Sequence, residues 1–199
     1  MLTFYPRDPL LARRIPCHLE NFWLASADMK ALLVIDMIND FLDPKGALFC
    51  GAEVRQIIPP LQEKLKEFRE KKLPVIYLCD QHDPEDQEFA AFVPHAIKGT
   101  WGAEVIPELT PQEGEDIVPK TRFSGFFRTP LEEILRKKGV TTVCLTGVCT
   151  SICVMDTAAD AFFRDFKIEV FKDCVGDFDP EMHEFALKRM ARIYQAKIL

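Results

Sequence analysis

Apolar runs alternate along the chain with segments whose apolar residues recur every three or four positions. A short, nearly continuous apolar run such as residues 31–36 is typical of a strand covered on both faces of a sheet. Such runs predict strands at residues 31–36, 74–79, 115–120, 141–147, 167–173 and 196–199. The helical spacing predicts helices at residues 53–71, 129–139, 151–165 and 180–193. This alternation indicates an α/β fold with a Rossmann-like, doubly wound and mostly parallel sheet, covered by helices on both faces.

Polar residues follow several of the predicted strands, at the point where each strand ends. They are Asp36, Asp80, His82, Lys120 and the turn at residues 147–153. Because parallel strands place their carboxyl ends at one edge of a sheet, we expect these residues to converge there. The long segment at residues 80–102 also leaves this edge, and loops of that length inside compact domains are usually functional.

Residues 1–28 lack this pattern and hold three prolines among mixed charges. We interpret them as an N-terminal extension to a single domain at residues 29–199, and as a possible upstream start with Met29 as the native initiator. An ordered arm packed on a partner subunit is the alternative. N-terminal sequencing of natively expressed protein tests the start hypothesis, which an intact Met1 would reject.

The composition of the chain indicates which kinds of molecule it binds. The net charge of -6 and the pI near 5.3 argue against nucleic-acid binding, and no basic patch is present. No apolar run approaches the ~20 residues of a membrane span, and the N-terminus does not resemble a signal peptide. The seven cysteines contain no Cys-x-x-Cys pair, so we expect free thiols in the reducing cytoplasm. A small-molecule substrate is the default expectation.

Cys153 is the candidate nucleophile. It falls in the first turn of the predicted helix after a strand, where the helix terminus favours a thiolate and offers unpaired N–H groups. Asp36 could take the thiol proton, and Lys120 could pair with Asp36 or stabilise negative charge. The alternatives are a small buried cysteine and two ordinary strand-end residues, and Cys149 is a rival nucleophile on spacing alone.

The segment Asp80-x-His82 holds two possible metal ligands directly after a strand, and His95 lies in the same loop. One carboxylate and two imidazoles commonly bind a divalent transition metal such as Zn, Fe or Mn. A solvated loop without a metal is the alternative reading of this short pattern.

Five segments in order resemble the nicotinamidase family of the isochorismatase-like cysteine hydrolase superfamily. They are VIDMINDF (34–41), LCDQHDPED (78–86), FVPHAIKGTWGAEV (92–105), KTRFSGF (120–126) and TGVCTSICVMDTAADAF (146–162). The match covers about residues 30–199. Two departures from the family pattern stand out: Ser151 replaces the usual Asp of the nucleophile turn, and Ala96 replaces the Cys that often follows the metal-binding His.

The resemblance implies an amidohydrolase that converts nicotinamide to nicotinate and ammonia through a cysteine thioester. It implies a catalytic triad of Asp36, Lys120 and Cys153, and a cis peptide before Cys149. The N–H groups of Cys149 and Cys153 would form the oxyanion hole. One divalent metal held by Asp80, His82 and His95 would anchor the pyridine ring. The aromatic residues implied at the substrate are Phe41, Phe92, and Phe123 or Phe126.

Two other functions remain open from the sequence. The first is a related cysteine hydrolase that acts on a ureido, carbamoyl or other aryl amide, with the same triad and a different pocket. The second is a non-catalytic binding protein on the same fold, which an unreactive Cys153 would favour. An isochorismatase proper is less favoured, because those enzymes generally lack the nucleophilic cysteine. We also expect a homo-oligomer.

Overall fold

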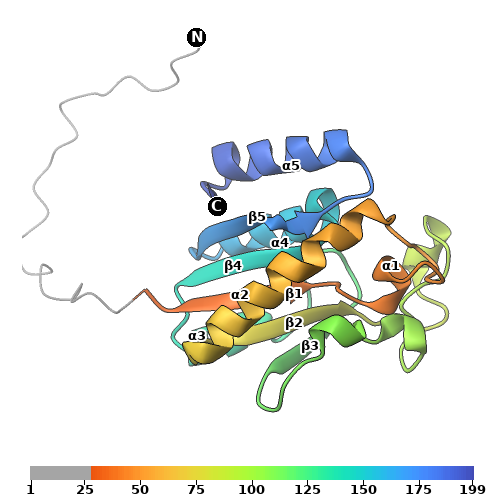
Figure 1. The fold of residues 1–199 in the computed structure, drawn as a ribbon, viewed down its shortest axis with the longest axis horizontal. Coiled ribbons are helices and arrows are strands. Elements are labelled where there is room, and N and C mark those ends of the chain that lie inside the picture. Colours follow the sequence, from red (N-terminus) through yellow and green to blue (C-terminus); the bar gives the residue numbers. More distant parts are fainter. Residues whose placement is uncertain (1–27) are drawn as a thin grey trace, which may run out of the picture.

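The computed structural model describes residues 28–199, so the interpretation of residues 1–28 as an extension falls, except for Asp28, outside the described residues. Six parallel strands form one sheet in the order β3-β2-β1-β4-β5-β6, seen in Figure 1. The strands are β1 (Lys30–Ile35), β2 (Val75–Asp80), β3 (Asp116–Lys120), β4 (Thr142–Val148), β5 (Lys167–Gly176) and β6 (Lys197–Ile198). The expected α/β fold with a parallel sheet is thereby confirmed.

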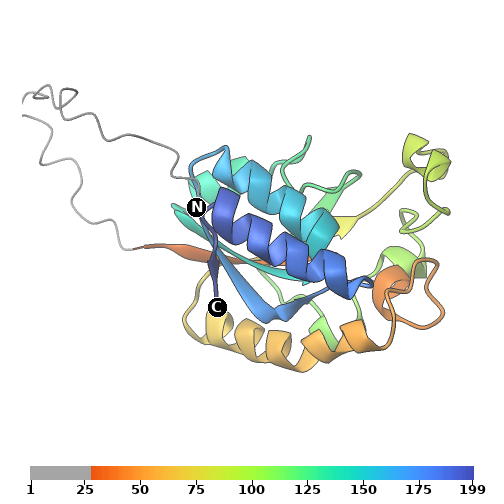
Figure 2. The same ribbon diagram turned by 90° about the horizontal axis from the view of Figure 1, so that it is seen from above.

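Helices cover both faces of this sheet, as Figure 2 shows from above. The covering helices are α2 (Ile58–Glu70), α3 (Leu131–Lys137), α4 (Met155–Phe162) and α5 (Pro180–Ile193), and the short helix α1 (Asn39–Leu42) lies beyond the end of β1 (Figure 1). Side chains of β1 alternate between two cores: Leu33 and Ile35 pack with α3, α4 and α5, while Leu32 and Val34 pack with α2. The unbroken apolar run of β1 thus reflects burial on both faces.

The residues at the N-termini of the two longest helices explain where these helices begin. Helix α2 carries prolines in its first positions, where no backbone N–H is needed, and buries Leu61, Leu65 and Phe68. Helix α5 begins after Asp179, whose carboxylate accepts hydrogen bonds from the N–H groups of Glu181 and Met182. The predicted range 180–193 for this helix is confirmed.

The helix after β4 differs from its prediction. The chain first forms a π-helical turn at Thr150–Val154, and regular helix α4 runs only from Met155 to Phe162. The carbonyl of Cys149 accepts hydrogen bonds from the N–H groups of Ile152 and Val154, at 3.1 and 3.2 Å. This wide turn carries Cys153, and a helical period alone does not distinguish it from an α-helix.

The long loop after β2 is ordered by a buried carboxylate on α1. Asp40 accepts hydrogen bonds from the N–H of Ala96 at 2.7 Å and of Ala47 at 3.0 Å. A Cβ on Gly102 would lie 2.2 Å from the same carboxylate, so only glycine allows the loop to approach it. Within residues 28–199, none of the helices has the length and apolar character to cross a lipid bilayer.

Candidate active site

Four strand ends meet at one edge of the sheet, as the sequence predicts. Asp36 follows β1, Asp80 and Lys120 end β2 and β3, and the turn with Cys153 follows β4. Asp36 adopts a positive φ of 52°, and its carboxylate accepts a hydrogen bond from the N–H of Asp80 at 2.9 Å. The strand ends therefore fix the direction of this carboxylate.

Gly147 allows β4 to lie close to β1 beside this carboxylate. Its φ is 104°, a region that favours glycine, and an added Cβ would lie 1.9 Å from the carbonyl oxygen of Ile35. The next peptide bonds lead directly into the turn that carries Cys153. The bond between Val148 and Cys149 is cis, as the resemblance implies.

Lys120 is the centre of the candidate catalytic group. Its Nζ lies 2.7 Å from Asp36 Oδ2, 2.6 Å from Asp80 Oδ1 and 3.6 Å from Cys153 Sγ. The side chains of Lys120 and Asp36 are completely buried. One ammonium thus faces two carboxylates and one thiol, and its charge compensates part of the negative charge of the two carboxylates.

The environment shifts the pKa of each of these groups. Burial raises the pKa of the Cys153 thiol well above its usual range, and the charge of Lys120 opposes this shift. Burial and the charge of Asp80 raise the pKa of Asp36, again against Lys120. Burial opposes the charge of Lys120, but Asp36 and Asp80 raise its pKa well above the usual value. The thiol is therefore protonated at rest and needs a base beside it to become a nucleophile.

Asp36 is in position to be that base. Carboxylate oxygens of Asp36 and Asp80 and the sulfur of Cys153 all lie within 4.8 Å of one another. The structure therefore brings together all three members of the expected triad, from three different strand ends.

The second cluster contains Asp80, His82 and His95, again as expected. Nε2 of His82 and of His95 lie 3.8 and 4.0 Å from Asp80 Oδ2. Nε2 of His82 is buried without a hydrogen-bond partner. Because such an atom is costly unless something binds it, the donor set fits a transition-metal cation.

The opposite ring nitrogens are held by the protein. Nδ1 of His82 lies 3.2 Å from Asp86 Oδ2, and Nδ1 of His95 lies 2.8 Å from the carbonyl oxygen of Val93. Ligating histidines are commonly oriented by such contacts, which leave Nε2 free to face a metal. Both imidazoles are thus pre-oriented toward Asp80.

Glu88 belongs to this cluster, although the sequence analysis did not find it. Its Oε1 lies 4.0 Å from Nε2 of both His82 and His95. It comes from a short 3-10 turn, Gln87–Ala90, in the long loop. The acidic character of that loop was the available signal, but no fixed spacing links Glu88 to the histidines.

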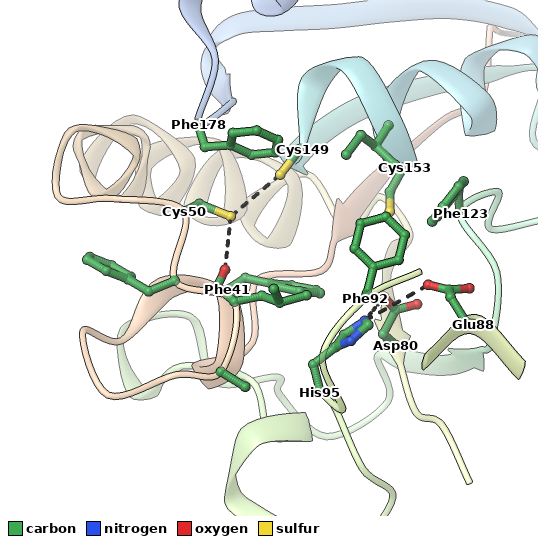
Figure 3. A pocket seen from close by; sticks show the side chains of 14 residues that line it. Phe41, Cys50, Asp80, Glu88, Phe92, His95, Phe123, Cys149, Cys153 and Phe178 are labelled. Carbon is green, nitrogen blue, oxygen red and sulfur yellow. Dashed lines mark hydrogen bonds and ion pairs between the residues drawn. The ribbon is translucent and has the colours of Figure 1, made fainter. Parts of the chain in front are cut away.

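A cavity of about 420 Å³ joins the two clusters, and Figure 3 shows its walls. Its lining residues are Phe41, Ala47, Leu48, Phe49, Cys50, Asp80, Glu88, Phe92, His95, Phe123, Cys149, Ile152, Cys153 and Phe178. Most of the wall is apolar or aromatic, and the polar groups are gathered at the catalytic and histidine side. This arrangement suits a flat, mostly apolar molecule with one polar end.

Three of the four expected aromatic residues line this cavity: Phe41, Phe92 and Phe123. The rings of Phe92 and Phe123 are perpendicular, with centroids 6.2 Å apart. Phe126, the alternative to Phe123 in the prediction from the sequence, does not line the cavity. It packs in the core against Phe166. Phe178, from the loop before α5, lines the cavity instead and was not predicted.

The two departures from the family pattern have distinct surroundings. The backbone N–H of Ser151 donates to Asp177 Oδ2 at 2.7 Å, so an acidic residue from the loop after β5 contacts the nucleophile turn. Ala96 is buried, and its N–H is the group that Asp40 binds. Position 96 therefore takes part in ordering the loop through its backbone N–H and not through its side chain.

Known proteins resemble this chain in sequence and in fold. The isochorismatase domain family matches residues 30–198. An uncharacterized isochorismatase family protein, PncA, of Bacillus subtilis strain 168 is 40% identical over 179 residues, which are 85% of this chain and 98% of that protein.

Several solved structures with the same fold have stated activities. Nicotinamidase/pyrazinamidase of Bacillus subtilis is 37% identical with a TM-score of 0.82, covering 85% of this chain and 98% of that one. N-carbamoylsarcosine amidase of Thermoplasma acidophilum is also 37% identical, with a TM-score of 0.79 and coverage of 85% and 95%. Pyrazinamidase of Pyrococcus horikoshii in complex with zinc is 34% identical, with a TM-score of 0.79 and coverage of 85% and 98%.

Proposed function

This chain belongs to the isochorismatase family of hydrolases, and from that premise we propose that it is a nicotinamidase, which converts nicotinamide and water to nicotinate and ammonia. One observation carries the proposal. Asp80 binds Lys120 beside Cys153 through Oδ1 and faces the two histidines through Oδ2. A ring held at the histidines would therefore present its carboxamide to the thiol within one cavity.

The proposed reaction begins with a proton transfer from the Cys153 thiol to the Asp36 carboxylate. The thiolate attacks the carboxamide carbon, and the oxygen becomes an oxyanion. The N–H groups of Cys149 and Cys153 bind this oxyanion, and the Lys120 ammonium stabilises the developing negative charge. The leaving nitrogen takes the proton from Asp36, and ammonia departs from a thioester.

Hydrolysis of the thioester completes the cycle. A water takes the place of ammonia, Asp36 accepts its proton, and the resulting hydroxide attacks the thioester carbon. The oxyanion forms again at the same N–H groups, and the acid leaves as the Cys153 thiol regains its proton. One base thus serves both halves of the reaction.

We propose that Asp80, His82 and His95 hold one divalent metal ion, Zn, Fe or Mn, with Glu88 beside them. When bound, this ion would orient the pyridine ring of the substrate. The zinc complex of the Pyrococcus horikoshii pyrazinamidase supports the assignment of a metal. The aromatic residues Phe41, Phe92 and Phe123 would enclose the ring from the remaining sides.

A carbamoyl amidase is the second candidate. The similarity to the N-carbamoylsarcosine amidase of Thermoplasma acidophilum is of the same size as that to the nicotinamidase. Such an enzyme needs the same triad, but its substrate has no ring nitrogen to bind a metal. The two candidates therefore differ in whether the histidine cluster is needed for substrate binding.

The test is ammonia release by purified, metal-loaded protein from nicotinamide and from N-carbamoylsarcosine. We expect release from nicotinamide by the wild type and by Cys174→Ala, a matched removal of a buried thiol outside the cavity, and none by Cys153→Ala. Metal content is measured on the same samples. Release from N-carbamoylsarcosine alone would reject the nicotinamidase assignment and favour the second candidate, and inactivity on both would reject both.

A further inference from the structure

Two cysteines that the proposed mechanism does not use as nucleophiles meet in the wall of the cavity. The sulfurs of Cys50 and Cys149 lie 3.5 Å apart, a contact drawn as a dashed line in Figure 3. Within residues 28–199 no other pair of cysteines makes such a sulfur–sulfur contact. The sequence suggested no partner for Cys50, because the two residues are 99 positions apart.

The two thiols belong to different segments that meet in the wall of the cavity. Cys50 follows α1, and its N–H donates to the carbonyl of Phe41 at 2.9 Å, so its segment is tied to that helix. Cys149 begins the turn that carries Cys153. A covalent bond between the sulfurs would therefore join the segment after α1 directly to the nucleophile turn.

Both thiols are reached through the cavity. Cys50, Cys149 and Cys153 all line it, and Cys149 is partly exposed. Cys79 and Cys144, by contrast, lie in buried strands and do not line the cavity. A small molecule that enters the substrate cavity can therefore approach the pair.

Contact between the two thiols favours a paired reaction. The hydrogen bond with Cys50 and burial raise the pKa of Cys149, so this thiol is protonated at rest. Once either thiol loses its proton, the other can donate its S–H to the new thiolate and then act as the second nucleophile. Their proximity makes ring closure faster than attack by a separate molecule.

We propose that Cys50 and Cys149 form a dithiol modification site, which a small disulfide entering the cavity converts to a Cys50–Cys149 disulfide. A thiolate of the pair attacks one sulfur of the small disulfide, which releases one small thiol and leaves a mixed disulfide. The second cysteine loses its proton to solvent and attacks the protein-bound sulfur, which releases the other small thiol. In total, two protein thiols are oxidised to one disulfide, and the small disulfide is reduced to two thiols.

The oxidised form is expected to be inactive, a consequence that rests on the proposed function. A disulfide holds its sulfurs at about 2.05 Å, so the two segments must move together from the present contact. Cys149 supplies an N–H of the proposed oxyanion hole, and a misplacement of about 1 Å costs roughly 10²-fold in rate. Reduction of the bond would restore the activity.

The experiment treats the full-length protein with bis(2-hydroxyethyl) disulfide and measures its intact mass and its alkylatable thiols. The primary sample is Cys153→Ser combined with Cys17→Ser, which removes the proposed nucleophile and the cysteine that lies outside the described residues. We expect it to lose two hydrogens and two alkylatable thiols without a mass adduct. This background combined with Cys174→Ser should behave the same, whereas Cys50→Ser or Cys149→Ser in that background should not. No internal disulfide, or one that persists in the Cys50→Ser background, would overturn the proposal.

Activity is then compared before and after oxidation in proteins that retain Cys153. We expect the wild type to lose activity by about 10²-fold and to regain it with dithiothreitol. Cys50→Ser cannot form the Cys50–Cys149 disulfide. Compared with its own untreated sample, it should therefore lose no activity through that bond. A cross-linked wild type that keeps its activity would overturn the regulatory role. If no amide is hydrolysed at all, the proposed function fails, but the mass measurement still decides whether the dithiol site exists.

Discussion

Lys120 is the residue on which the candidate site most depends. Its ammonium is a counter-charge for the two buried carboxylates of Asp36 and Asp80. A buried ion pair contributes little net stability compared with an apolar replacement of both partners, but removal of one partner is strongly unfavourable. Its substitution therefore affects folding and chemistry together.

We predict that Lys120→Met abolishes amide hydrolysis and lowers the free energy of unfolding by about 3–5 kcal/mol, because the buried carboxylate of Asp36 loses its only cationic partner among the described residues. Urea unfolding followed by circular dichroism measures the change. Lys137→Met, on an exposed position of α3, is the matched control and should stay within about 0.5 kcal/mol of the wild type. Equal stability of the two variants would contradict the role assigned to the ammonium.

The nucleophile turn is the element that the catalytic geometry depends on. It follows β4 as a π-helical turn, and its second residue, Ser151, is bound through its N–H by Asp177. The same carboxylate accepts a hydrogen bond from the N–H of Asp179 at 3.2 Å. Asp177 thus connects the turn to the loop that begins α5, and we interpret it as a positioning residue.

We predict that Asp177→Ala lowers kcat by about 10-fold with a smaller change in KM, because the turn loses a charge-assisted hydrogen bond worth about 1.5–3 kcal/mol. Asp177→Asn keeps an acceptor oxygen and should recover most of kcat. Ser151→Ala is the control, since the observed contact uses only its backbone. Steady-state kinetics on all three variants test this, and a failure of Asp177→Asn to recover would indicate a different role for the charge.

At the scale of the whole molecule, a metal ion would connect the end of a sheet strand to two positions of the loop that follows it. Asp80 ends β2, Glu88 lies in the following turn and His95 lies further along the loop. A ligand that binds the folded state and not the unfolded chain adds stability according to its concentration relative to its Kd. A bound metal ion should therefore stabilise the folded state in addition to orienting the substrate.

We predict that removal of the metal by a chelator lowers Tm by about 5–10 °C, as expected for an ion present at about 100 times its Kd. Adding back Zn²⁺ should restore Tm. His95→Ala should show no such response, whereas His183→Ala, on α5 and outside the cluster, should respond as the wild type does. Differential scanning calorimetry measures the midpoints, and a metal response retained by His95→Ala would argue against the assigned ligands.

Much of the architecture could be predicted because burial leaves a local pattern. The strand β1 is buried on both faces and therefore reads as an uninterrupted apolar run. Helix α5 begins within an Asp–Pro pair: Asp179 caps the helix and Pro180, with its fixed backbone dihedral, is its first residue. Parallel strands also bring their ends to one edge, which is why Asp36, Asp80 and Lys120 could be grouped before any contact was known.

The sequence by itself therefore determined the α/β alternation, the strand ends and the residue types at them, because each is recorded in neighbouring residues. The tertiary structure alone decided that Glu88 faces the two histidines, that Cys50 meets Cys149 and that Phe126 packs into the core. Those contacts join segments distant along the chain. They depend on the path of loops and the direction of side chains, for which no local periodicity exists.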